Sequence, residues 1–143
     1  MTVAAILKGK TGGVISARPD DSIESVCQLL ADKGIGAVLV LRPDGSIAGI
    51  LSERDIVRGL AMIGTDLLKQ GADSIMTRNV MVCSSHDTLG DIMHLMTKRR
   101  IRHLPVVDNG RLTGMISIGD VVKRRIAETE MEAEALRQYI ATG

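Results

Sequence analysis

One short motif occurs twice in the chain, and its residue types suit a site for phosphate and sugar. Gly-x-x-Ser-x-x-Asp is present at Gly49, Ser52 and Asp55 and again at Gly114, Ser117 and Asp120. Where a strand ends and a helix begins at such a serine, the free backbone N–H groups form an anion site. The hydroxyl can donate to a phosphate oxygen, and the carboxylate can accept two hydrogen bonds from a ribose diol. The same spacing is typical of a helix capping box, so a purely structural role stays open.

A cationic run, Lys98–His103, precedes the second motif and leads directly into an apolar segment. Most such runs are solvated surface, but Arg102 and His103 are expected at the entrance of a strand, where they would form a cationic wall. The matching residues ahead of the first motif, Gly36–Ala37, are small and neutral. Arg54, whose counterpart in the second motif is a glycine, can supply a cation there. The two halves therefore offer unequal binding of anions.

Both features lie in an internal repeat that covers most of the chain, and repeats decide the fold. Aligning Val14 with Val80 also pairs Asp21 with Asp87, and both motifs coincide after one residue drops out of the alignment. Upstream, Ile6-Leu7 matches Ile75-Met76. Residues 62–72 join the two copies and are interpreted as the linker.

Each copy predicts the same order of elements, β-α-β-β-α. The first helix of each copy is expected to begin at a cap, Asp21 or Ser22 in one copy and Thr88 in the other. Asp44-Gly45 and Asn109-Gly110 predict hairpin turns, because these residues accept a positive φ at low cost. A second helix is expected to begin at each motif serine. The expected strands are residues 14–15, 37–41 and 47–51, then 80–82, 104–107 and 112–116.

The predicted fold class is α/β (α+β), with two β-α-β-β-α repeats packed sheet to sheet with pseudo-twofold symmetry. A repeat of about 60 residues is too short to bury a sufficient core alone. The expected division is residues 1–68 for the first repeat, 69–127 for the second and 128–143 for a helical extension.

Composition and motifs exclude several classes of function. The formal charge of +1 and the single aromatic residue, Tyr139, argue against a nucleic-acid partner. No apolar stretch is long enough to span a membrane or act as a signal peptide, so a cytoplasmic location without membrane association is expected. Cys27 and Cys83 are expected to be buried free thiols. The sequence shows neither a catalytic triad nor the spacing of zinc ligands, so the chain is predicted not to be an enzyme and to hold no metal.

The ordered set of motifs resembles a tandem pair of CBS domains (the cystathionine β-synthase repeat), also called a Bateman module. The resemblance covers roughly residues 3–126. It rests on Ile75-Met76-Thr77, Arg102-His103-Leu104-Pro105-Val106-Val107, Asn109-Gly110 and both Gly-x-x-Ser-x-x-Asp motifs. It implies a stand-alone regulatory module that binds adenine nucleotides or related adenosyl compounds, such as AMP, ATP, S-adenosylmethionine or NAD(H), in the cleft between the repeats.

The resemblance also implies roles for individual residues. Asp55 and Asp120 would accept the ribose hydroxyls, with Ser52 and Ser117 near ribose or phosphate. Arg102 and His103 would face phosphate, and Arg54 is a further candidate for this role. The remaining expected nucleotide-binding residues surround the adenine: Thr77, Asn79 and Val80 at its edge, Val82 and Ile116 on its faces, and Pro105. The first copy lacks the Arg-His pair, so its site is expected to prefer a less charged ligand.

The resemblance implies a homodimer and output through an unknown effector protein, as an energy or redox sensor. The alternative is a dimerisation scaffold with vestigial pockets. After Asp120 the sequence predicts a helix to about Ile140, with seam residues at alternating spacings of four and three. That helix could pack on its own domain, close a dimer or dock on a partner. The residues at the seam are Val122, Ile126, Thr129, Ala133, Leu136 and Ile140.

Overall fold

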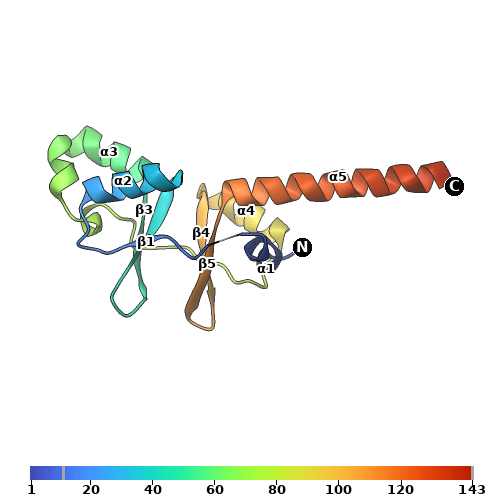
Figure 1. Ribbon diagram of the computed structural model, residues 1–143, viewed down its shortest axis with the longest axis horizontal. Helices are drawn as coiled ribbons and strands as arrows, with labels where there is room; N and C mark the ends of the chain where they lie inside the picture. The colour runs from blue at the N-terminus through green and yellow to red at the C-terminus, as the bar shows by residue number, and fades with distance from the viewer. Residues whose placement is uncertain (11, 143) are drawn as a thin grey trace. The chain divides into compact units, whose positions relative to one another are not determined.

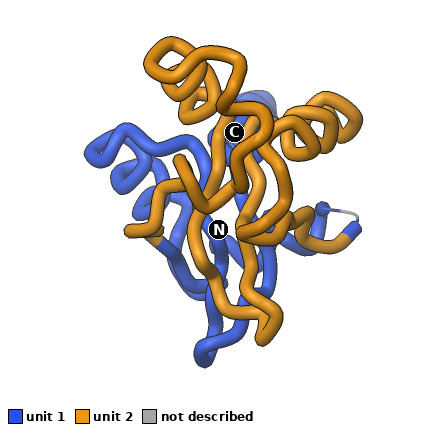
Figure 2. Tube along the Cα trace, turned by 90° about the vertical axis from the view of Figure 1, so that its left-hand side faces the viewer, with its two compact units in different colours: residues 1–12, 82–143 blue, residues 13–81 orange. Residues whose placement is uncertain are grey.

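The computed structural model describes residues 1–10 and 12–142, which divide into two compact units. Unit 2 is the continuous segment Gly13–Met81, whereas unit 1 joins Met1–Gly12 to Val82–Gly143 (Figure 2). The compact units thus differ from the ranges 1–68 and 69–127 expected for the repeats. The segment that precedes each repeat in the sequence packs with the other repeat.

Unit 2 contains the β-α-β-β-α order expected for the first copy. Strand β1 (Ser16–Ala17) runs parallel to β2 (Ala37–Leu41), which pairs antiparallel with β3 (Ile47–Ser52). Helix α2 (Ile23–Lys33) connects β1 to β2, and α3 (Glu53–Ile63) follows β3 (Figure 1). Two short 3-10 helices, η1 (Thr65–Lys69) and η2 (Ala72–Ser74), complete the unit. The core includes Ile23, Val26, Val38, Val40, Leu51 and Leu67.

Unit 1 repeats this arrangement with one strand missing. Helix α4 (Leu89–Arg99) leads into the antiparallel pair β4 (His103–Asp108) and β5 (Arg111–Ser117), and α5 (Ile118–Thr142) follows. Helix α1 (Val3–Lys8) completes the unit. The core includes Val3, Ile92, Met96, Leu104, Ile116 and Val121. Both units therefore bury one face of a small sheet under helices, which confirms the predicted mixed α/β class.

The strand expected at residues 80–82 is wrong. Only Cys83 forms a parallel bridge, to Val106, through hydrogen bonds of 2.9 Å to the Pro105 carbonyl and 2.8 Å from the Val107 N–H. The next two residues turn their polar groups to Asp108 instead of continuing the ladder. In the first copy the strand begins two residues later than expected, at Ser16.

The predicted caps and turns are confirmed. Ser22 accepts a hydrogen bond from the Ser25 N–H at 3.1 Å, and Thr88 caps α4 in the same way. Asn109 and Gly110 both adopt positive φ in the β4–β5 turn, at 52° and 75°. These local signals therefore fix where the helices begin and how the strands pair.

Candidate functional site

Each motif serine lies at the junction of a strand with a helix, and each begins the helix with a capping box. In unit 2 the Ser52 N–H donates to the Asp55 carboxylate at 3.0 Å, and the Asp55 N–H donates to the Ser52 hydroxyl at 3.1 Å. The Glu53 N–H donates to the Gly36 carbonyl at 2.9 Å. The motif therefore forms the predicted helix capping box, and this role is compatible with binding a ligand at the same junction.

The junction in unit 1 has the same geometry. The Ser117 N–H donates to the Asp120 carboxylate at 2.9 Å, and the Asp120 N–H donates to the Ser117 hydroxyl at 3.2 Å. The Ile118 N–H donates to the Arg102 carbonyl at 2.8 Å, as its counterpart does in unit 2. In both motifs Oδ2 of the aspartate accepts from the serine N–H.

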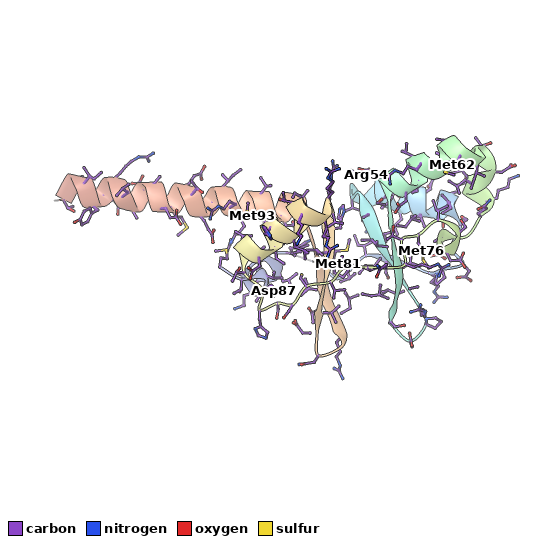
Figure 3. All side chains as sticks on the ribbon, turned by 180° about the vertical axis from the view of Figure 1, so that it is seen from behind. Arg54, Met62, Met76, Met81, Asp87 and Met93 are labelled. Atoms are coloured by element: carbon purple, nitrogen blue, oxygen red, sulfur yellow. The ribbon has the colours of Figure 1, made fainter. Side chains whose placement is uncertain are left out.

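A segment from farther along the chain lies over the junction in unit 2. The backbones of Thr77 and Ile50 exchange two hydrogen bonds, each of 2.9 Å. Met76, which is labelled in Figure 3, lies close to Gly49. A Cβ at Gly49 would be 2.8 Å from the Met76 sulfur, which explains the motif glycine. Thr77 is thereby attached to the strand that ends at Ser52. Asn79 and Val80 follow in the chain.

In unit 1 the segment after α1 lies at the junction, and it contributes the side chain of Lys10. Leu7 lies over Gly114, where a Cβ would be 2.6 Å from its Cδ2. The Lys10 ammonium donates to the Met115 carbonyl at 2.8 Å and to the Asp120 carboxylate at 2.9 Å. Lys10 was not among the residues expected at this site. The match of Ile6-Leu7 with Ile75-Met76 was the signal, because it sets the residues after Leu7 against those after Met76.

Lys10 changes the electrostatics of Asp120. Partial burial raises the pKa of this carboxyl, but the Ser117 N–H and the Lys10 ammonium lower it by more, so the net pKa lies below its ordinary value. The side chain of Asp120 is 26% exposed and that of Lys10 is 40% exposed. The carboxylate is therefore ionised at neutral pH and already holds one cation.

The predicted cations lie near both junctions. Arg54 is exposed in the first turn of α3 (Figure 3), and Arg102 is exposed directly before β4. His103 is partly buried and pairs with Ser117 in the β4–β5 register. The structure thus brings Arg102, His103, Ser117 and Asp120 together in unit 1.

The side chains expected around the adenine are not equally accessible. Ile116, expected on an adenine face, is fully buried in the core of unit 1. Because side chains alternate along a strand, Met115 lies on the face of β5 opposite to Ile116. Ile50 has the equivalent position in β3, and both side chains are partly exposed. Val82 is 45% exposed, whereas the Pro105 side chain is buried.

Within residues 1–10 and 12–142, no group of three or more His, Cys, Asp or Glu residues is placed to hold a metal ion. Over the same residues, no helix combines the length and apolar character needed to cross a bilayer.

Comparison with known proteins agrees with the doubled junction. The family model described as "CBS domain" matches residues 10–62 and again residues 72–127. The chain belongs to the CBS-domain family. The CBS-domain containing protein ATU1752 from Agrobacterium tumefaciens is 44% identical, with a TM-score of 0.84 over 87% of this chain and 92% of that one. This CBS chain therefore has the fold of a tandem CBS pair.

Two further relatives extend the comparison. The mitochondrial CBS domain-containing protein CBSX3 of Arabidopsis thaliana is 31% identical over 99% of this chain and 73% of its own length. The CBS domain pair of protein MJ0100 is 26% identical, with a TM-score of 0.78 over 90% of this chain and 98% of that one. That pair was solved in complex with 5′-methylthioadenosine and S-adenosyl-L-methionine. The chain spans only 32% and 39% of two other curated relatives.

Proposed function

We propose that this chain is a regulatory module that binds adenine-containing ligands, such as AMP, ATP or NAD(H), and acts through a partner protein. The observation that carries the proposal is the doubled junction, in which a strand ends at Ser52 or Ser117 and an aspartate lies partly buried at the helix start. The complex of MJ0100 with two adenosyl compounds supports the ligand class. The chain is proposed to signal rather than to catalyse.

The proposed contacts follow the chemistry at each junction. Asp55 and Asp120 accept the ribose hydroxyls, because a carboxylate oxygen not used in the capping box can accept from a diol. Ser52 and Ser117 contribute near ribose or phosphate. Thr77, Asn79, Val80, Val82 and Pro105 are the remaining proposed contacts to the base.

The two junctions are proposed to differ in the charge of ligand they accept. In unit 1, Arg102 and Lys10 supply cationic groups for phosphate and His103 an imidazole, whereas Arg54 is the cation of the motif in unit 2. A ligand that uses Asp120 must displace the Lys10 ammonium or draw it onto a phosphate. Unit 1 therefore suits nucleotides with several phosphates, and unit 2 suits less charged adenosyl compounds.

Calorimetric thermal unfolding with AMP, ADP, ATP, NADH and S-adenosylmethionine tests the ligand class. A single Tyr and no Trp give a weak optical signal, so calorimetry is the better method. A ligand present at 100 times its Kd stabilises the folded state by about 2.7 kcal/mol, a shift of several degrees. If no ligand shifts the transition, the proposal is wrong and the scaffold alternative is favoured.

The residue assignment needs matched variants in the same assay. Asp120→Asn and Asp55→Asn should each lose the shift produced by the ligand of that junction. Asp32→Asn is the control, because Asp32 is an exposed residue of α2 and the substitution removes the same charge. Full ligand shifts in both junction variants would leave the ligand class intact but refute the assignment.

A further inference from the structure

Helix α5 continues well beyond the other elements of unit 1 (Figure 1). It runs for 25 residues, of which only Val121 is fully buried. Large apolar side chains farther along remain exposed: Val122 by 46%, Ile126 by 54%, Leu136 by 60% and Ile140 by 70%. Together with Thr129 and Ala133 they form one stripe at alternating spacings of four and three, called here the α5 seam. This spacing is the heptad pattern of a coiled coil.

We propose that the α5 seam is a dimerisation surface whose partner is α5 of a second copy, paired parallel and in register. The spacing assigns Val122, Thr129 and Leu136 to heptad position d. Ile126, Ala133 and Ile140 then occupy position a. β-branched residues at a with leucine at d favour parallel two-stranded pairing. Two of the three a positions are isoleucine and one of the three d positions is leucine, so the core residues fit this rule in part and the orientation rests on the flanking charges.

Charge complementarity at the flanking positions supports the parallel orientation. In a parallel pair, a residue at g faces the residue five places later, at e, in the other helix. Arg125 at g then faces Glu130 of the second copy, and Glu132 at g faces Arg137. Both pairs join opposite charges, and the symmetry of the dimer repeats each of them once.

The antiparallel orientation brings like charges together. When the seam is aligned antiparallel about its centre, position e faces e and position g faces g. Glu130 then faces Glu130 of the other copy, Glu132 faces Glu132, and Lys123 faces Arg137. Like charges at these positions are unfavourable, so the sequence discriminates against this arrangement.

The arginines of the proposed pairs are free to change partners. Arg125 contacts Glu128 at 3.5 Å, and Arg137 contacts Glu134 at 3.2 Å, both within α5. Their side chains are 55% and 74% exposed. Exposed ion pairs of this kind contribute little, so exchanging them for contacts between helices has a low cost.

Disulfide trapping of the full chain tests orientation and register together. In the parallel pair the two Thr129 positions face each other, so the Thr129→Cys variant should form a disulfide-linked dimer under mild oxidation. The matched control is Glu134→Cys, on the outer side of the helix, which should not cross-link. The native thiols give little background, because burial raises the pKa of Cys83 to about 12 and raises that of Cys27. No cross-link with Thr129→Cys, or equal cross-linking of both variants, overturns the proposal.

A charge exchange provides an independent test by sedimentation equilibrium. Arg125→Glu places glutamate opposite Glu130, and Glu130→Arg places arginine opposite Arg125, so each variant should associate about tenfold more weakly. Mixing the two variants restores opposite charges at every contact, and heterodimers should recover the wild-type affinity. A monomeric wild type, or a mixture no tighter than the single variants, contradicts parallel pairing.

Discussion

Replacing Lys10 by methionine should destabilise unit 1 and do so in a pH-dependent way. The Lys10→Met change keeps most of the aliphatic stem and removes the ammonium that contacts Asp120 and the Met115 carbonyl. Lys8→Met is the matched control, because Lys8 is exposed two residues before Lys10 and the substitution removes the same charge.

The expected magnitude follows from the exposure of the pair. With Lys10 40% and Asp120 26% exposed, solvent screens the ion pair, so its contribution falls in the range of ~0.5–1 kcal/mol. The pKa of Asp120 is lowered in the folded state, so its stabilising effect is full above the unfolded value near 3.9. It is lost as the pH falls through the folded value.

Urea unfolding followed by far-UV circular dichroism at pH 7 and pH 2.5 measures this difference. At pH 7 the variant should have a lower free energy of unfolding by ~0.5–1 kcal/mol. At pH 2.5 the difference should be smaller and approach the part due to the Met115 carbonyl, because protonation of Asp120 removes its attraction to the Lys10 ammonium. An equal loss at both pH values, or the same loss in Lys8→Met, would refute the reasoning.

Other changes have distinct expected outcomes. Gly49→Ala should cost ~1–3 kcal/mol in urea unfolding, because the new methyl would lie 2.7 Å from the backbone carbonyl of Thr77. Gly114→Ala should cost less, since the conflicting atom is a leucine methyl that can move; equal costs would contradict this. Ser52→Ala should cost ~0.5–2 kcal/mol through loss of the helix cap, and a neutral result would contradict the capping role. The Cys83 thiol, with its pKa raised to about 12 by burial, should react with a disulfide reagent only on unfolding; rapid labelling of the native chain would show otherwise.

Local signals in the sequence were sufficient for most of the fold. Caps at Ser22 and Thr88, and the turn at Asn109-Gly110, depend on neighbouring residues, and all three are present as predicted. The strand at residues 80–82 failed for a non-local reason. The single bridge to β4 forms at Cys83, and beyond it Ser84 and Ser85 bond to Asp108, a residue remote in sequence, so the position and length of this pairing could not be read from local residues.

The candidate site was less predictable than the fold. Ile116 was assigned to a ligand because of the resemblance to CBS domains, but the face of β5 that enters the core decides its burial. Lys10 lies in a glycine-rich stretch that carries no motif, and it acquires a role only when that stretch meets Asp120. Tertiary placement, rather than residue type, determines both outcomes.

The exchange of leading segments between the repeats has a consequence for the order in which the chain folds. Unit 2 is one continuous stretch, so all of its contacts are available once residue 81 has been synthesised. Unit 1 cannot close until its second half exists, because hydrogen bonds such as that from Val3 to Asp87 join its two parts. The intervening loop costs less entropy to close when it has already collapsed into a folded unit. Helix α1 is therefore synthesised long before the residues it packs against. Folding of unit 2 then lowers the entropy cost of joining the two parts of unit 1.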